Sequence, residues 1–530
     1  MTRIIAFIPL LPFLLFAVRR LMSYLHIFQQ EEYDGSRFLP WLIRTRSVDK
    51  KLSAVVLVIA VIGLLAPQFG VWLSLALAAA FVAFFFLEAD PRKAAKKKLV
   101  LTARAKRILG VAFAISAAAA LAVSWLQAPL WAWLVLLHLL PVFLVVANLL
   151  LGPVEQRIQQ GFWQEAHDKL LARKPTIVGI TGSFGKTSVK HILGHVLEMH
   201  APTLLTPGSV NTPMGIARIV REQLDARHQN FVCEMGAYGP GSIERLCRLA
   251  PPDIGVITAV GHAHYERFKS LDVVAQTKFE LAQAVVAKGG KVIVAEQVLA
   301  FAPAQTFFAA HRVHMTTVGM SDQADLRITA IRQTAAGTEA DVQWQGKPYT
   351  IKAPLYGAHH GMNLALAFAT AAVMGIAPDS IVFSLATTPQ IRHRLEVKRE
   401  PNGSVLIDDA YNSNPVGFAS GLAALDVLRT AEGRRILVTP GMVELGAAHD
   451  AEHEKIGTLA GSHVDVLLPV LPERIAGMVA AYKAANPAGQ VIPCENFASA
   501  QAWLSANLRA GDTVLLENDL PDLYEAKLSL

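Results

Sequence analysis

Cysteine is nearly absent from this chain, which contains only Cys233, Cys247 and Cys494 among its 530 residues. The three form no Cys-x-x-Cys pair and no cluster with histidine, so the sequence indicates neither a disulfide framework nor a zinc or iron–sulfur site. Isolated cysteines of this kind are typical of reduced thiols in a protein that faces the cytosol. Internal repeats and long low-complexity segments are also missing, which excludes repeat architectures.

Charged residues are scarce in the first third of the chain outside two basic loops. Residues 1–152 contain 16 Lys and Arg but only 6 Asp and Glu, whereas the remainder contains 33 and 36. The net charge of +7 and the sequence pI near 9.2 therefore originate in the first third. Because this basic excess flanks apolar segments, it does not indicate a nucleic-acid-binding protein, and we expect no nucleic acid among the partners.

Five long apolar runs fill this charge-poor third, and they cover about residues 4–18, 52–69, 71–87, 108–126 and 129–151. A helix needs about 20 apolar residues to cross the hydrocarbon core, so the last four runs are long enough and the first is short. The first run lacks the cleavage site of a signal peptide, which favours an uncleaved anchor. Two or three spans with a buried hydrophobic hairpin are the alternative.

The two basic loops predict the orientation of these spans. Residues 19–51 carry seven Lys and Arg, and residues 88–107 carry eight more. Basic loops stay on the cytoplasmic side, so five spans place the N-terminus outside and everything after Gly152 in the cytoplasm. We therefore predict a multi-pass protein of the inner membrane, in contact with its lipids, whose other domains meet cytoplasmic ATP.

The stretch "TIVGITGSFGKTS" begins as a buried apolar strand, continues as a turn of small residues and ends in the start of a helix. Its glycines let backbone N–H groups surround phosphate oxygens, while Lys186 adds positive charge and the Thr187 hydroxyl can hold Mg²⁺. The general phosphate-loop pattern has a further glycine where this chain has Ile180. The predicted nucleotide-binding residues of the turn are Gly182, Ser183, Gly185, Lys186, Thr187 and Ser188.

Several further blocks follow the phosphate loop in a fixed order. They are "SVNTPMGIARIV", "FVCEMGAYG", "GHAHYERFKSLDVVAQTKFE", "YGAHHGMN", "RHRLEV" and "VLIDDAYNSNP". Together with the loop, this series resembles the Mur ligases, the ATP-dependent amide-forming enzymes of cell-wall assembly that also include folylpolyglutamate synthetases. The resemblance covers about residues 176–530 and is closest to the branch that adds D-alanyl-D-alanine to UDP-N-acetylmuramoyl-tripeptide.

The resemblance implies that Lys186, Glu234, His264 and Lys278 are catalytic residues. It implies as metal ligands Thr187, Glu234, His264 and Lys278. Glu234 ends a strand and can share Mg²⁺ with Thr187, a solvated strand-end acid being the alternative. His264 takes the place of the family's metal-binding histidine. Lys278 takes the place of a lysine that family members carry carbamylated, which would support a second Mg²⁺; a plain surface lysine is the alternative.

The same resemblance implies nucleotide and substrate contacts. Asn363 is expected to contact adenine, Arg394 to reach the nucleotide phosphates and Asp409 to hydrogen-bond the ribose. The tentative substrate contacts are Asn211, Thr212, Tyr411, Asn412, Asn414 and Glu444. The chain departs from the family at residues 440–442 and 517–520, both expected on the substrate side, so the amine substrate stays open.

Alternating strands and helices after residue 152 predict an α/β fold. We expect a transmembrane region at 1–152, a central ATP-binding domain at 153–390 and a smaller Rossmann-like domain at 391–530. The implied activity is ATP-dependent amide formation through an acyl phosphate, with ATP and two Mg²⁺ ions as cofactors. An amino acid or dipeptide would be joined to a carboxylate acceptor in cell-wall precursor synthesis.

Two alternatives to this function stay open. The acceptor could be a lipid-linked or exported polymer such as polyglutamate, because membrane helices stand where cell-wall ligases of this branch have a domain that holds the UDP-sugar. From another class, the chain could be a non-catalytic membrane scaffold or a transporter-associated nucleotide-binding protein.

Overall fold

The computed structural model describes residues 2–45, 49–92, 99–261, 268, 270–411, 413–430, 432–443 and 445–518. It divides into two compact units, and the boundary lies between Gln159 and Gln160. The domain limits predicted at residues 152 and 390 stay predictions.

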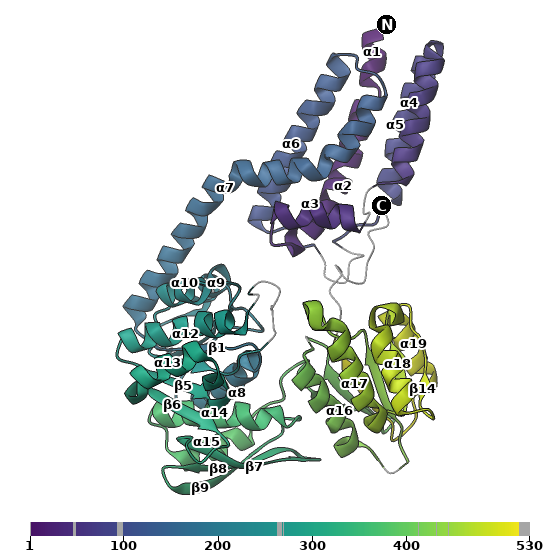
Figure 1. Ribbon diagram of the computed structural model, residues 1–530. Coiled ribbons are helices and arrows are strands. Elements are labelled where there is room, and N and C mark those ends of the chain that lie inside the picture. Colours follow the sequence, from purple (N-terminus) through teal and green to yellow (C-terminus); the bar gives the residue numbers. More distant parts are fainter. Residues whose placement is uncertain are drawn as a thin grey trace. The chain divides into compact units, whose positions relative to one another are not determined.

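The described part of the first unit is helical (Figure 1). Its helices are α1 Thr2–Phe7, α2 Leu10–Gln30, α3 Gly35–Arg44, α4 Lys51–Leu65, α5 Gly70–Leu87, α6 Ala103–Trp125 and α7 Trp131–Arg173, whose last residues belong to the second unit. Four segments are long and apolar enough to cross a membrane, namely Ile4–Gln30, Pro67–Leu87, Ala103–Trp125 and Trp131–Arg173. They correspond to four of the five predicted spans.

Two of the predicted spans differ in length from what the apolar runs indicated. The first span continues past Arg20 to Gln30, so it is long enough after all. Helix α4 has only 15 residues. It is about 22 Å long, which is less than the hydrocarbon thickness of about 30 Å.

Helix α2 contains a buried arginine, Arg20, whose charge is paired with two carboxylates. The Arg20 guanidinium contacts Asp49 at 2.6 Å and Glu88 at 3.0 Å. Asp49 also accepts a hydrogen bond of 2.9 Å from the Leu52 backbone N–H at the start of α4. Asp49 precedes α4 and Glu88 directly follows α5. Arg20 of α2 therefore contacts both the start and the end of the α4–α5 pair.

A nine-stranded sheet forms the first part of the second unit. Its order is β2-β3-β1-β4-β5-β6-β7-β8-β9, and all neighbours are parallel except the last two pairs. The strands are β1 Thr176–Thr181, β2 Thr203–Leu205, β3 Asn230–Glu234, β4 Ile254–Ile257, β5 Lys291–Ala295, β6 Met315–Gly319, β7 Leu326–Thr334, β8 Gly337–Trp344 and β9 Lys347–Ala353. The helices are α8 Lys186–Glu198, α9 Pro213–Gln223, α10 Ser242–Leu249, α12 Leu271–Ala287, α13 Ala302–Ala310, α14 His359–Val373 and α15 Pro378–Ala386 (Figure 1).

A six-stranded sheet of order β10-β11-β15-β12-β13-β14 follows, parallel except for its edge strand β10. Its strands are β10 Glu396–Arg399, β11 Val405–Asp409, β12 Arg435–Thr439, β13 Val466–Pro469, β14 Gln490–Val491 and β15 Thr513–Glu517. Its helices are α16 Pro415–Leu428, α17 His449–His463, α18 Ala476–Ala485 and α19 Phe497–Asn507. The predicted α/β fold class is confirmed.

Candidate active site

The phosphate loop joins the central strand β1 to helix α8. Gly182 and Gly185 have φ angles of 156° and 80°. A Cβ atom on Gly182 would lie 1.9 Å from the Thr258 hydroxyl oxygen, and one on Gly185 would lie 2.7 Å from Asn363 Oδ1. Both positions therefore require glycine. Ile180, where a longer loop would have its first glycine, is instead a fully buried residue of β1.

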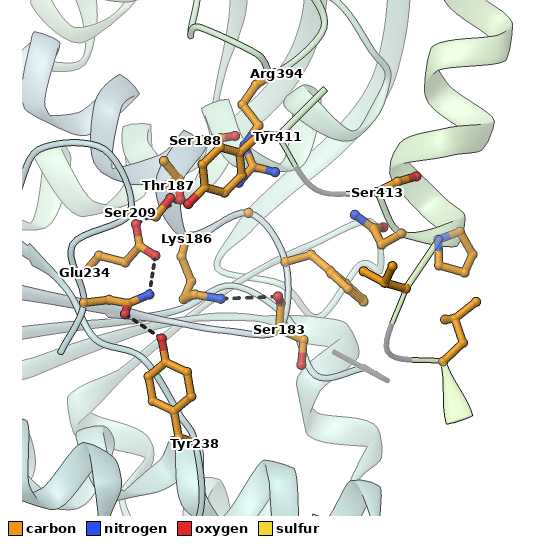
Figure 2. A pocket seen from close by; sticks show the side chains of 17 residues that line it. Ser183, Lys186, Thr187, Ser188, Ser209, Glu234, Tyr238, Arg394, Tyr411 and Ser413 are labelled. Atoms are coloured by element: carbon orange, nitrogen blue, oxygen red, sulfur yellow. Dashed lines mark hydrogen bonds between the residues drawn. The ribbon is translucent and has the colours of Figure 1, made fainter. Parts of the chain in front are cut away.

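Lys186 is the first residue of α8, and its side chain folds back over the loop (Figure 2). Its Nζ donates to the Gly182 carbonyl at 2.6 Å and to the Ser183 carbonyl at 3.3 Å. Burial lowers the pKa of Lys186, the Glu234 carboxylate opposes this, and the Arg394 charge lowers it further. The amine can exchange these carbonyls for phosphate oxygens, which would restore the pKa of the lysine.

Glu234 lies at the carboxyl end of β3, the strand beside β1, and is almost fully buried. The Thr187 hydroxyl donates to its Oε2 at 2.9 Å, and the Asn211 amide donates to its Oε1 at 3.1 Å. The Tyr238 hydroxyl in turn donates to Asn211 at 2.8 Å (Figure 2). The alternative of a solvated acid is therefore wrong. A carboxylate beside a hydroxyl is the donor set that Mg²⁺ prefers.

Lys278 lies on α12 and is buried. The alternative of a surface lysine is therefore wrong. Burial lowers its pKa well below the usual value, and the Lys186 charge adds to this effect. Among the described residues, no hydrogen bond or ion pair reaches its ammonium. A neutral buried amine is a good nucleophile for CO₂, so the residue fits the predicted carbamate. His264 lies outside the described residues.

Two adjoining cavities surround the phosphate loop. The smaller, of about 260 Å³, is lined by the predicted residues Ser183, Gly185, Lys186, Thr187, Ser188, Asn211, Glu234, Arg394, Tyr411 and Asn414 (Figure 2). The larger, of about 650 Å³, is lined by the predicted residues Gly185, Ser188, Asn363, Arg394, Asp409 and Asn414. Of these residues, Lys186 and Thr187 line only the smaller cavity, and Asn363 and Asp409 line only the larger one. Arg394 lines both.

The larger cavity contains polar atoms without partners. Asn363 Nδ2 and His359 Nδ1 are buried, and neither has a hydrogen-bond partner within the part of the chain that the structure describes. Burial and the Arg394 charge lower the pKa of His359 to about 4, so its imidazole is neutral. Leaving such groups unpaired costs about 1–3 kcal/mol each. The donors and acceptors of a nucleotide base would satisfy them.

Asp409 ends β11 and faces the same cavity. Burial raises its pKa to about 6, although the Arg394 charge and the Leu395 backbone N–H, 3.3 Å from its Oδ1, oppose the rise. Glu517 is its register partner on β15 and is fully buried. Its Oε1 accepts a hydrogen bond of 2.5 Å from Ser413, a residue that lines the smaller cavity. The placement of residues 517–520 on the substrate side stays a prediction.

The tentative substrate residues have different environments. Thr212 caps α9 by accepting from the Gly215 N–H at 3.3 Å and lines neither cavity. Asn414 caps α16 through the Gly417 N–H at 3.0 Å and lines both. The ring of Tyr411 lies 4.5 Å from the Arg394 guanidinium. Asn412 and Glu444 lie outside the described residues.

Sequence reasoning missed Lys190 and Tyr238. Lys190 Nζ lies 3.4 Å from Glu234 Oε2 and also donates to the Gly208 carbonyl, and the side chain is fully buried. Its position four residues after Lys186, on the same face of α8, was the available signal. Tyr238 lines the smaller cavity but carried no comparable signal.

Residues 180–371 match the Mur ligase middle domain, and residues 393–517 match the Mur ligase glutamate ligase domain. The UDP-N-acetylmuramoyl-tripeptide–D-alanyl-D-alanine ligase of Mycobacterium leprae is 30% identical over 387 residues, which cover 66% of this chain and 72% of the relative. The same-named ligase of Mycobacterium tuberculosis is 34% identical over 302 residues, 55% of this chain and 57% of the relative. The chain thus spans little more than half the length of the first curated relatives that it matches.

The fold is shared with a solved structure. The MurF ligase of Thermotoga maritima, in complex with ADP, superposes with a TM-score of 0.58 at 24% identity and covers 70% of this chain and 82% of that structure.

Proposed function

Because the chain belongs to the Mur ligase family, we propose that it is an ATP-dependent ligase that forms an amide bond. In the first step an oxygen of the acceptor carboxylate attacks the γ-phosphorus of ATP, so that ADP leaves and an acyl phosphate forms. In the second step an amine attacks the acyl carbon, phosphate leaves and the amine loses a proton. The observation that carries this proposal is the convergence of Lys186, Thr187 and Glu234 on one cavity at the start of α8.

The described residues divide the work of the first step. The positive N-terminal end of α8 and Lys186 would hold the β- and γ-phosphates. Thr187 and Glu234 would hold Mg²⁺, which neutralises charge on the transferred phosphoryl group. Arg394, Tyr411 and Asn414 reach the same cavity from the loops of the six-stranded sheet, where they would exclude the water that hydrolyses an acyl phosphate.

Lys278 would support a second Mg²⁺ after reaction with CO₂. The amine nitrogen attacks the carbon of CO₂, and a proton leaves, so that a neutral amine becomes a carbamate anion. The low pKa that burial gives Lys278 supports this proposal, because only the unprotonated amine reacts.

The acceptor and the amine are proposed from the relatives. The two mycobacterial ligases are named for joining D-alanyl-D-alanine to UDP-N-acetylmuramoyl-tripeptide, and we propose the same class of substrates for this chain in cell-wall precursor synthesis. A lipid-linked or polymeric acceptor, as in polyglutamate synthesis, is the second candidate. The four helices that could cross a membrane favour it. A non-catalytic scaffold is disfavoured, because the residues proposed to bind phosphate and Mg²⁺ line one cavity.

We further propose a multi-pass location in the inner membrane, with the second unit in the cytoplasm. Large exposed aromatic residues support it, since aromatic side chains gather at membrane interfaces. Phe69 and Trp72 lie at one short link, and Trp125 and Trp131 lie at the other. With the N-terminus outside, the five predicted spans place both links on the outer side of the membrane.

Phosphate release from ATP by the detergent-purified full chain tests the ligase activity. The assay would pair UDP-muramoyl-tripeptide with D-alanyl-D-alanine, and compare lipid-linked acids with amino acids. We expect turnover with one acceptor class, its loss in Lys186→Ala, and its retention in Lys288→Ala, a surface lysine paired with Asp253. ATP binding without turnover on any acid would favour the scaffold.

A further inference from the structure

The turn that carries Arg394 has an unusual backbone. His393 and Leu395, the residues on either side, have φ angles of 57° and 49°. Residues other than glycine seldom adopt this left-handed region, least of all a bulky one such as leucine. A turn of this kind persists only where its surroundings hold it in place, and such turns gather at functional sites.

The surroundings of this turn supply several contacts. His393 Nδ1 lies 2.9 Å from Asp408 Oδ2, and the His393 N–H donates to Glu396 Oε2 at 3.3 Å. The Leu395 N–H donates to Asp409 Oδ1 at 3.3 Å. Glu396 and Asp408 are direct partners across β10 and β11, so residues of both strands hold the turn in place.

Lys398 completes the cluster. Its ammonium lies 3.2 Å from Glu396 and 3.1 Å from Asp408. The donor atoms of His393, Glu396 and Asp408 lie within 4.8 Å of one another, a spacing that a metal ion could use. Lys398 already provides both carboxylates with a cation, so the cluster is an ion-pair network that needs no metal.

Arg394 is held between the two left-handed residues of this turn and lies at the nucleotide site. It lines both cavities and lies over the ring of Tyr411. Successive residues of a strand point to opposite faces, so Asp408 and Asp409 of β11 have different partners. Asp409 faces the larger cavity, whereas Asp408 binds His393.

We propose that His393 and Asp408 are positioning residues, whose contact fixes the left-handed turn and so orients Arg394 toward the phosphates of the nucleotide. The proposal rests on the nucleotide-binding part of the proposed function. It predicts that loss of the His393–Asp408 contact acts only through Arg394.

A double-mutant cycle on Mg²⁺·ADP binding tests this, measured by calorimetry on the detergent-purified full chain. Arg394→Ala should weaken binding about tenfold or more, the value expected for loss of a charged hydrogen bond. His393→Gly keeps the backbone conformation accessible but removes the imidazole, and it should weaken binding about fivefold, within the range of one hydrogen bond. The double variant should bind no more weakly than Arg394→Ala alone. Asp408→Asn should resemble His393→Gly.

Two further variants separate positioning from general damage. His393→Asn should restore binding to nearly the original affinity, because asparagine tolerates left-handed backbone and its amide can donate to Asp408. His228→Ala, which removes another imidazole 2.9 Å from an aspartate, should bind like the unaltered chain.

Unchanged affinity in His393→Gly, or additive losses in the double variant, would overturn the proposal. If the unaltered chain binds no ADP, both this proposal and the proposed function fail. If it binds ADP but forms no amide with any acceptor, the ligase function fails while the cycle still decides the role of His393.

Discussion

At the scale of the residue, burial controls the charges of this site. Lys186 and Lys278 have lowered pKa values and Asp409 has a raised one, and in each case burial is the largest cause. Groups with pKa values shifted in this way are common at catalytic and binding sites. A bound ligand can supply the charge or the hydrogen bonds that burial removed from them.

The pKa of Asp409, about 6, predicts how nucleotide binding depends on pH. Above pH 6 the carboxylate can accept hydrogen bonds from both ribose hydroxyls, whereas below pH 6 it is protonated and accepts poorly. We therefore expect the affinity for Mg²⁺·ADP to fall as the pH drops through 6, by at most about tenfold per pH unit. Calorimetry from pH 5 to 8 measures this.

ADP itself titrates in this range, so Asp409→Asn serves as the reference. It should bind weakly at all pH values and lack the extra loss below pH 6. Parallel curves for the two proteins would show that Asp409 does not contact the nucleotide.

Carbamylation of Lys278 predicts a direct spectroscopic signal. Full-length protein prepared with ¹³C-bicarbonate should show a carbamate carbon resonance in the NMR spectrum. The signal should disappear in Lys278→Met, which keeps the apolar stem but has no amine. An active enzyme without such a resonance would mean that Lys278 works unmodified.

At the scale of the element, much of the site could be predicted from sequence order. A β-branched apolar run before Gly182 and a helix after Gly185 sufficed to predict β1, the phosphate loop and α8. Glu234 could be predicted because neighbouring parallel strands end at the same edge of the sheet.

Other features could not be predicted, because they depend on contacts between distant segments. The left-handed turn at His393 depends on strand β11, and the burial of Glu517 depends on Ser413. The short length of α4 could not be predicted, because apolar composition alone does not show where a helix ends.

The loop geometry predicts the effect of replacing Gly185. Gly185→Ala should lower the melting temperature by about 2–4 °C, since a left-handed alanine costs about 1–2 kcal/mol. It should also weaken Mg²⁺·ADP binding strongly, because its Cβ would lie 2.7 Å from Asn363 Oδ1. Thermal unfolding and calorimetry measure the two effects.

Gly289 provides a matched control. Its φ angle of 76° is close to that of Gly185, and a Cβ atom there would meet no atom of the described residues within 4 Å. Gly289→Ala should lower the melting temperature similarly but leave ADP binding unchanged. Equal loss of binding in both variants would contradict a specific role for the loop geometry.

At the scale of the whole molecule, the chain joins a helical unit, whose helices include four segments long and apolar enough to cross a membrane, to an α/β unit. The last turns of α7 belong to the second unit by their packing, since Ala166 and Leu170 are part of its core. His167 Nδ1 contacts the Leu249 carbonyl at 3.0 Å, and Arg221 pairs with Glu165 at 2.6 Å.

This packing predicts where the chain can be cut. A fragment of residues 154–530 should remain soluble without detergent and bind Mg²⁺·ADP. A fragment that starts at residue 174 should unfold at a lower temperature, because it exposes the apolar surface that α7 covers. Equal melting temperatures would show that the end of α7 contributes nothing to the second unit.

The central claim is that an acceptor carboxylate is activated by ATP as an acyl phosphate. An isotope experiment tests it most directly, with the acceptor that supports turnover carrying ¹⁸O in its reacting carboxylate. The account predicts ADP as the nucleotide product and one ¹⁸O atom in each released phosphate. Phosphate without ¹⁸O, or AMP and pyrophosphate as products, would contradict it.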